Sequence, residues 1–202
     1  MAIDAGEPPD SELIARAQGG DKEAFAVLYR RHQAVVYRFA CQMTGSATLA
    51  EDIVQDVFLV LMRELGRYDP SRAALTTYLY GVARNISRYR IRGLRRLTSL
   101  DAAVNAVTVD DPSARIAQSD QLRQLRAGIA SLPSRYREVL LLCDVHALTY
   151  VEAALALKLP VGTLRSRLHR ARRLLAERLQ ARLKARLKMS SRVPLQKNGY
   201  VV

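Results

Sequence analysis

Five polar side chains near the end of the chain have the chemistry and the spacing to contact the edges of DNA bases. Arginine can donate two parallel hydrogen bonds to guanine, and a serine hydroxyl can bond to several bases. The intervals i, i+1, i+4, i+5 and i+8 place all five on one face of a helix, called the reading face below. A solvated basic face on an ordinary core helix would show the same pattern, so both interpretations stand at this point. The five residues are Arg165, Ser166, His169, Arg170 and Arg173.

The elements around the reading face favour the DNA interpretation. Apolar residues recur on the opposite side of the same helix, which should begin near residues 160–161. A short alanine-rich helix is predicted from about Tyr150 to Leu157, so the two would form a helix-turn-helix with its turn at Lys158. A left-handed conformation at Lys158 would cost on the order of 1 kcal/mol relative to glycine. The apolar stripe consists of Leu164, Leu168, Ala171 and Leu175.

The charge of the 202-residue chain points to an anionic partner, and nucleic acid is the first candidate. The formal net charge is +13, but it is unevenly distributed. Residues 1–70 carry a net charge of −4 and residues 100–164 a net charge of −1, whereas residues 71–99 carry +7 and residues 165–202 carry +11. Two basic blocks on otherwise acidic or neutral bodies suit two DNA contacts by one chain, with a different partner at the acidic surface.

The first basic block forms a ridge on a helix predicted from about Thr77 to Gly93. Its arginines recur every three or four residues beside an asparagine, with no acid in the block to neutralise them, which suits contact with phosphates. Nearby tyrosines could stack on unpaired bases, although two of the four are expected in the core. The basic ridge consists of Arg84, Asn85, Arg88, Arg92 and Arg95, and the tyrosines are Tyr68, Tyr78, Tyr80 and Tyr89.

An acidic edge marks the helix predicted over residues 47–65, for which Thr48 is the expected N-cap. Four residues share one face of this helix, away from its apolar positions. A leucine among acidic groups fits a surface that docks a partner, and a plain solvated surface is the alternative. This docking edge consists of Asp52, Gln55, Asp56 and Leu59.

These patterns predict an all-α chain with two small helical domains. An N-terminal helical bundle should span residues 11–96, after a disordered stretch at 1–10. A flexible linker at 97–120 should lead to a C-terminal four-helix domain at 121–180, which contains the helix-turn-helix. The helix after the turn could continue past Leu175, since leucines recur at 179, 183 and 187. The basic C-terminal extension at 181–202 could add phosphate contacts, act in regulation or be a solvated tail, and the solvated tail is favoured. Cys41 and Cys143 are expected to be reduced core thiols, with no metal site and no signal peptide.

Five motifs in order resemble the bacterial RNA polymerase sigma factors of the extracytoplasmic-function (ECF) type. The resemblance covers about Ser11 to Leu179. It implies a protein that keeps only the second and fourth conserved regions of sigma factors and directs core RNA polymerase to promoters. Such a protein has no catalysis and no cofactor of its own. The motifs are EAFAVLYRRH, AEDIVQDVFL, LTTYLYGVARN, SLPSRYREVLLL and PVGTLRSRLHRAR.

The resemblance also implies a role for each surface. The docking edge would bind the clamp helices of the largest polymerase subunit. The basic ridge, together with Tyr68, would melt the −10 promoter element and hold its single strand, with Asn85 next to a flipped base. The reading face would contact the duplex −35 element. An anti-sigma protein is an implied partner, the implied location is cytoplasmic, and a membrane-bound anti-sigma protein would hold the chain at the inner membrane.

Two other classes of function remain as alternatives. A stand-alone helix-turn-helix regulator would leave the docking edge and the basic ridge unexplained. An enzyme is disfavoured, because His32, His146 and His169 are the only histidines and form no arrangement with a Ser, Cys or Asp nucleophile or partner. A glycine-rich phosphate loop is also missing from the sequence, and no small-molecule substrate is expected.

Overall fold

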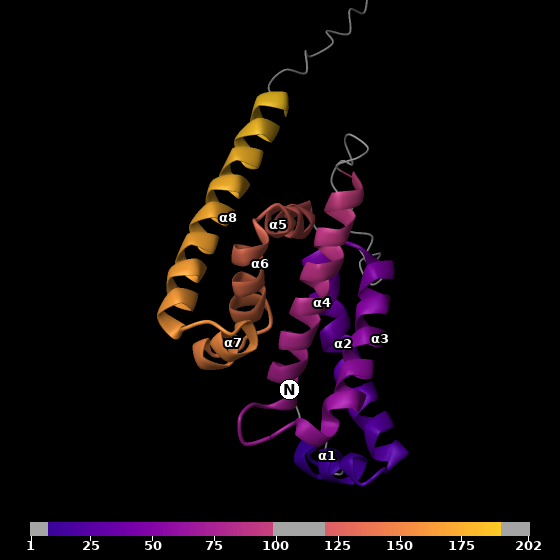
Figure 1. The fold of residues 1–202 in the computed structure, drawn as a ribbon. Helices are drawn as coiled ribbons and strands as arrows, with labels where there is room; N and C mark the ends of the chain where they lie inside the picture. The colour runs from indigo at the N-terminus through magenta and orange to yellow at the C-terminus, as the bar shows by residue number, and fades with distance from the viewer. Residues whose placement is uncertain (1–7, 99–119, 191–202) are drawn as a thin grey trace, which may run out of the picture.

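The computed structural model describes residues 8–98 and 120–190, and every regular element in these two ranges is a helix (Figure 1). The all-α prediction is therefore confirmed. Most of the expected linker, residues 99–119, lies outside the described residues, as do residues 1–7 and 191–202. The first range contains α1 (Asp10–Gln18), α2 (Lys22–Thr44), α3 (Ala47–Glu64), η1 (Leu65–Arg67) and α4 (Leu75–Thr98), and the second contains α5 (Asp120–Ala130), α6 (Ser134–Leu140), the π-helical turn η3 (Leu141–Val145), α7 (Tyr150–Leu157) and α8 (Val161–Ser190).

Side-chain caps determine where the long N-terminal helices begin. The Asp21 carboxylate accepts hydrogen bonds from two backbone N–H groups in the first turn of α2, as its position in the sequence predicts. The cap of α3 was predicted wrongly. Ser46 accepts the hydrogen bond from the backbone of Leu49, so α3 begins before Thr48. The docking edge therefore begins beyond the first turn of its helix.

The N-terminal body consists of α2, α3 and α4 packed side by side, with α1 across one end (Figure 1). Asp10 was assigned to a disordered terminus, but it begins α1 and holds that helix in place. Its carboxylate lies 2.7 Å from the His32 imidazole and also accepts a hydrogen bond from Arg31. Burial opposes ionisation of Asp10, but the hydrogen bonds and charges of these two partners outweigh it and hold the pKa of Asp10 below its usual range.

The helix-turn-helix has the bounds that the sequence predicts. Thr149 and Glu152 form a capping box at the start of α7, in which each side chain binds the backbone N–H of the other. Lys158 ends α7 with φ 52° and ψ 51°, the left-handed conformation expected for this turn. The backbone N–H of Leu159 then bonds to the carbonyl of Ala154, which completes a Schellman motif.

Replacing Lys158 with glycine should stabilise the C-terminal body by about 0.5–1 kcal/mol. The left-handed backbone costs a residue with a Cβ about 1–2 kcal/mol, and part of the gain is lost because glycine is more flexible in the unfolded chain. Urea unfolding followed by circular dichroism would measure the change. Lys158→Ala is the matched control, since it removes the same side chain but keeps the Cβ. Equal stabilisation by both substitutions would contradict the backbone explanation.

The last helix continues past Leu175, as the recurring leucines predict, and α5 anchors its middle part. α8 continues to Ser190, and α5 packs against it at a position without a side chain, because a Cβ on Gly128 would lie 2.9 Å from Leu175 and 3.2 Å from Leu179. Arg178 donates to the hydroxyl of Ser131. The described part of the 181–202 extension is therefore helical and begins beside α5.

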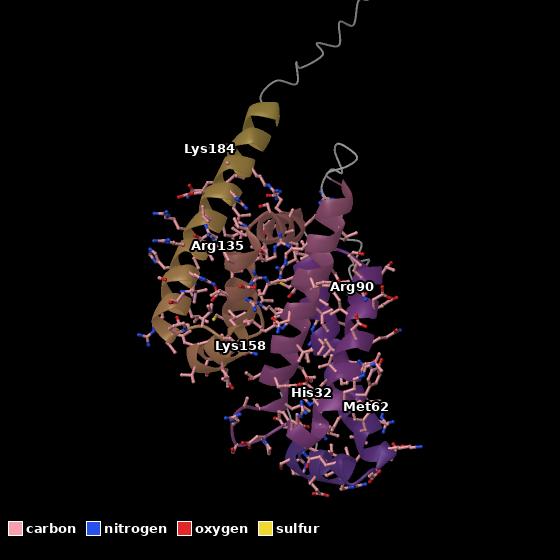
Figure 2. The ribbon with its side chains drawn as sticks, in the orientation of Figure 1. His32, Met62, Arg90, Arg135, Lys158 and Lys184 are labelled. Atoms are coloured by element: carbon pink, nitrogen blue, oxygen red, sulfur yellow. The ribbon has the colours of Figure 1, made fainter. Side chains whose placement is uncertain are left out.

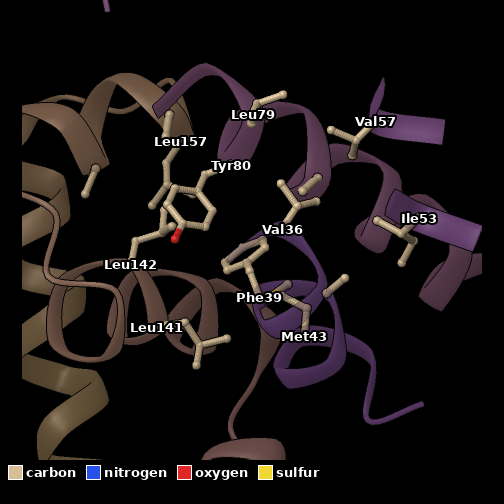
Figure 3. Packing of buried hydrophobic residues seen from close by; sticks show 14 of the residues in the cluster. Val36, Phe39, Met43, Ile53, Val57, Leu79, Tyr80, Leu141, Leu142 and Leu157 are labelled. Atoms are coloured by element: carbon tan, nitrogen blue, oxygen red, sulfur yellow. The ribbon is translucent and has the colours of Figure 1, made fainter. Parts of the chain in front are cut away.

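The two bodies pack directly against one another. α4 contacts α7, and α2 contacts α5 and α6, so that α5, α6 and α7 lie between α8 and the N-terminal body (Figure 1). Figure 3 shows Tyr80 and Phe39 of the N-terminal body facing Leu142 and Leu157 of the C-terminal body. The sequence predicts two domains joined by a flexible linker and contains no clear signal for this interface.

Candidate nucleic-acid interface

The reading face on α8 is exposed, and three of the four residues in the apolar stripe behind it are buried. All five of its residues are exposed, whereas Leu164, Leu168 and Ala171 are at most 2% exposed. Arg170 lies near Tyr136 of α6, and interaction with its guanidinium is the main cause that lowers the pKa of the Tyr136 hydroxyl. The helix therefore presents donors to solvent on a rigid support, as contact with a DNA groove requires.

Two further side chains of the reading face have defined neighbours. The guanidinium of Arg165 lies 5.7 Å from the centre of the Tyr150 ring, and the hydroxyl of Ser166 donates to the carbonyl of Thr163. Tyr150 belongs to α7, so the first helix of the helix-turn-helix helps to orient the second. Base contact by these residues stays a prediction.

The basic ridge on α4 does have an acid to neutralise it, contrary to the sequence-based expectation. The acid is Glu138, which comes from α6 in the other body and is completely buried. Arg84 donates two hydrogen bonds to its carboxylate, at 2.9 and 3.3 Å, and a guanidinium nitrogen of Arg88 lies 3.8 Å away. Asn85 and Arg92 remain exposed. The structure thus divides the ridge into a covered part and an open part.

The tyrosines near the ridge occupy different environments. Tyr68 and Tyr80 are 8% and 3% exposed, which confirms that two of the four lie in the core. The Tyr68 hydroxyl donates to the carbonyl of Ala73 and so stabilises the loop before α4, and burial raises the pKa of this tyrosine. The Tyr78 hydroxyl donates to the Glu64 carboxylate, whereas Tyr89 is 75% exposed. A base contact by Tyr68 would require its ring to become accessible.

The docking edge lies on the outer side of α3. Asp52 and Gln55 are exposed, and Leu59 is 46% exposed. Asp56 accepts a hydrogen bond of 2.7 Å from Arg90 of α4, so its charge is partly neutralised within the N-terminal body. Met62, one turn beyond Leu59, is 57% exposed and extends the apolar part of the edge (Figure 2).

His146 is a residue that sequence reasoning considered only as a catalytic candidate. The structure inserts its ring between the two bodies, where one nitrogen lies 2.9 Å from the Tyr80 hydroxyl and the other 2.8 Å from the amide oxygen of Gln42. Burial, with a contribution from the charge of Arg38, lowers the pKa of His146 to about 4. Its neutral ring therefore belongs to the interface. Only a pattern spanning both bodies could have revealed this role.

Among the described residues, no group of three or more His, Cys, Asp or Glu side chains could hold a metal ion. Within the same ranges, no helix is long and apolar enough to cross a membrane. The surfaces that stand out are thus the reading face, the basic ridge and the docking edge.

Comparison with known proteins identifies the two bodies. The family model for Sigma-70 region 2 matches residues 28–97, and the model for Sigma-70, region 4 matches residues 122–175. The chain is 32% identical over 182 residues to the ECF RNA polymerase sigma-E factor of Escherichia coli (strain K12), a match that covers 85% of this chain and 94% of that protein. The chain belongs to the ECF sigma factors. Its N-terminal and C-terminal bodies are called region two and region four below.

Other relatives agree with this assignment. This chain is 32% identical over 156 residues to the ECF RNA polymerase sigma factor SigE of Mycolicibacterium smegmatis. The match covers 75% of this chain and 60% of that protein's length. Among solved structures, the sigma factor RpoE in complex with the anti-sigma factor NepR from Bartonella quintana is similar, with a TM-score of 0.61 and 25% identity. The similarity covers 73% of this chain and 91% of the RpoE chain.

Proposed function

We propose that this ECF sigma factor directs transcription by reading the duplex −35 element with α8 and holding the melted −10 strand on α4. The observation that carries the proposal is the exposed reading face, which lies on the helix matched by the region 4 model. Its arginines can bond to guanine edges, and the ridge on the other body supplies charges for phosphates. The protein contributes specificity and no catalysis.

The docking edge would bind the clamp helices of the largest subunit of core RNA polymerase. Asp52, Gln55 and Leu59 form an exposed face with an acidic border, which complements a basic partner. An anti-sigma protein is a further proposed partner, supported by the similarity to RpoE, whose solved structure is a complex with the anti-sigma factor NepR. A cytoplasmic location, and retention at the inner membrane by a membrane-bound anti-sigma protein, form part of the same proposal.

Run-off transcription with bacterial core RNA polymerase tests this function. Genomic DNA serves as the template, and sequencing of the transcripts maps the promoters from which they start. The wild-type chain should produce transcripts from promoters that share −35 and −10 sequences. Promoter-specific DNA binding without any effect on core polymerase would instead identify a stand-alone regulator. Transcripts that start at random positions would also contradict the proposal.

Truncating Leu59 to alanine should weaken binding to core polymerase about five- to tenfold. A half-exposed leucine that becomes buried at an interface contributes about 1–1.5 kcal/mol through its apolar area. Fluorescence titration of labelled sigma factor with core enzyme would measure the dissociation constant. Leu183→Ala is the matched control, since Leu183 is 55% exposed and lies on the distant end of α8. Equal effects of the two variants would exclude Leu59 from the docking surface.

A further inference from the structure

The segment that joins α3 to α4, residues 65–74, is called the connecting loop below. It contains Tyr68, whose hydroxyl donates to the carbonyl of Ala73 at 2.6 Å and so joins one part of the loop to the other. α1 crosses the end of the bundle where the loop lies (Figure 1). The side-chain amide of Gln18 in α1 donates to the carbonyl of Leu65 at 2.8 Å. The start of the loop is therefore fixed to α1.

A chain of three polar side chains, called the polar chain below, fixes the end of the loop to the same helix. The ionised Asp10 carboxylate has only acceptor oxygens, so Nε2 of His32, which lies 2.7 Å away, must donate to it. Nδ1 of a neutral ring is then an acceptor, and the Thr76 hydroxyl lies 3.5 Å from it, at the long limit for a hydrogen bond. His32 is 6% exposed, so water competes little for these contacts. Thr76 stands in the first turn of α4, where the loop ends.

The attachment of α1 to the bundle does not depend on these polar contacts alone. Leu13 and Ile14 are 1% and 2% exposed, so the apolar face of α1 is buried in the core. Burial of two large aliphatic side chains outweighs one neutral hydrogen bond several-fold. Removal of the Gln18 amide or the Thr76 hydroxyl should therefore loosen the connecting loop without releasing α1.

We propose that α1 determines the sequence specificity of the −10 contact, because it positions the connecting loop through Gln18 and the polar chain. The proposal rests on the proposed function, in which Tyr68 and the basic ridge hold the melted −10 strand, and it adds the residues that position the loop. The ridge supplies contacts to phosphates, which carry no sequence information. A loosened loop keeps those contacts but misplaces the groups around Tyr68. Different −10 sequences are then bound more equally.

Hydrogen exchange of the full-length chain tests the positioning. Thr76→Val keeps the shape of the side chain but removes the hydroxyl, and Gln18→Ala removes the amide. Loss of one neutral hydrogen bond shifts an equilibrium roughly two- to tenfold, so the backbone amides of residues 65–74 should exchange faster by about that factor. Thr76→Ser restores the hydroxyl and should restore the wild-type rate. Arg16→Ala is the matched control in α1, since the Arg16 guanidinium donates to Asp21 before α2, and it should leave the exchange of the loop unchanged.

Run-off transcription with core polymerase tests the specificity, on a promoter from the genomic assay whose −10 positions have been randomised. The ratio of transcripts from the preferred −10 sequence to those from single-base variants should fall roughly two- to tenfold in Thr76→Val and Gln18→Ala. Their affinity for core polymerase should not change. His32→Gln places an amide nitrogen where Nε2 lies but nothing at Nδ1, so it should match Thr76→Val. Combining these two substitutions should cause no further loss.

The two measurements separate the possible failures. Unchanged exchange of the connecting loop in Thr76→Val and Gln18→Ala would overturn the positioning role of α1. Faster exchange with an unchanged transcript ratio would overturn its role in specificity. A wild-type chain that yields no promoter-specific transcripts would instead refute the proposed function, and hydrogen exchange would still decide whether α1 positions the loop.

Discussion

Replacing Arg170 with alanine is expected to weaken binding to a −35 duplex by about 1–3 kcal/mol, or roughly five- to 150-fold, and to relax specificity at one base position. Arg170 is exposed on α8, and its guanidinium lies near enough to Tyr136 to lower the pKa of that hydroxyl. A neighbour that restricts the side chain reduces the entropy lost when it engages a base. Arg165, which lies over Tyr150, should show a similar loss at a different base.

Lys184→Ala is the matched control for charge. Lys184 is exposed on the same helix, fourteen positions and about 21 Å beyond Arg170 (Figure 2). Its removal should change nonspecific binding and salt dependence without changing base preference. Binding of a library of −35 sequences by the full-length chain, with and without core polymerase, would measure both properties. A uniform loss across all sequences in Arg170→Ala would show that this residue contacts phosphate and does not read a base.

Acidification from pH 7.5 to pH 5 is expected to raise roughly 30-fold the ratio of open molecules, in which regions two and four have separated, to closed molecules, in which they pack as in this structure. The pKa of His146 is about 4 in the closed form, where Tyr80 of α4 and Arg38 of α2 face the ring, and separation from region two should return it to about 6.5. Above pH 6.5 the ring is neutral in both forms and the closed form keeps its full stability. Below pH 6.5 the open form takes up a proton, and about 2 kcal/mol is lost by pH 5.

Small-angle X-ray scattering reports this change, because separation of the two regions raises the radius of gyration. The mean radius of gyration of the wild-type chain should rise between pH 7.5 and pH 5. His146→Gln keeps a neutral group that can bond to Gln42 and Tyr80, so its radius of gyration should change little with pH. A similar response of both proteins would assign the titration to another group.

Much of the fold follows from local chemistry. The 3.6-residue period identifies the helices. On α8, leucines recur at helical spacing on one side and arginines on the other, which identifies its buried and its exposed side. Asp21 and Lys158 act through their immediate backbone neighbours, so their roles as cap and turn were predictable. Ser46 was missed because serine and threonine are both favoured N-cap residues, and the sequence does not show which hydroxyl reaches the backbone of the first turn.

Contacts between distant segments were not predictable in the same way. Glu138 precedes an apolar run in the sequence and resembles any helical surface glutamate, yet it is buried against arginines some fifty positions earlier. Gly81 interrupts a helix for no local reason, and its purpose becomes visible only beside Ala156. Such pairings depend on how two bodies meet, and a helical period carries no information about that.

The sequence by itself determined that the chain is all-helical, that two basic helices belong to separate bodies, and which side of α8 faces outward. These properties arise from the spacing of residues within one helix and from the charge of one segment. Only the tertiary structure decided that the basic ridge is partly covered and that His146 is held neutral. Both depend on burial and on charges brought together across the interface, because a side chain's pKa and accessibility are set by its neighbours in space.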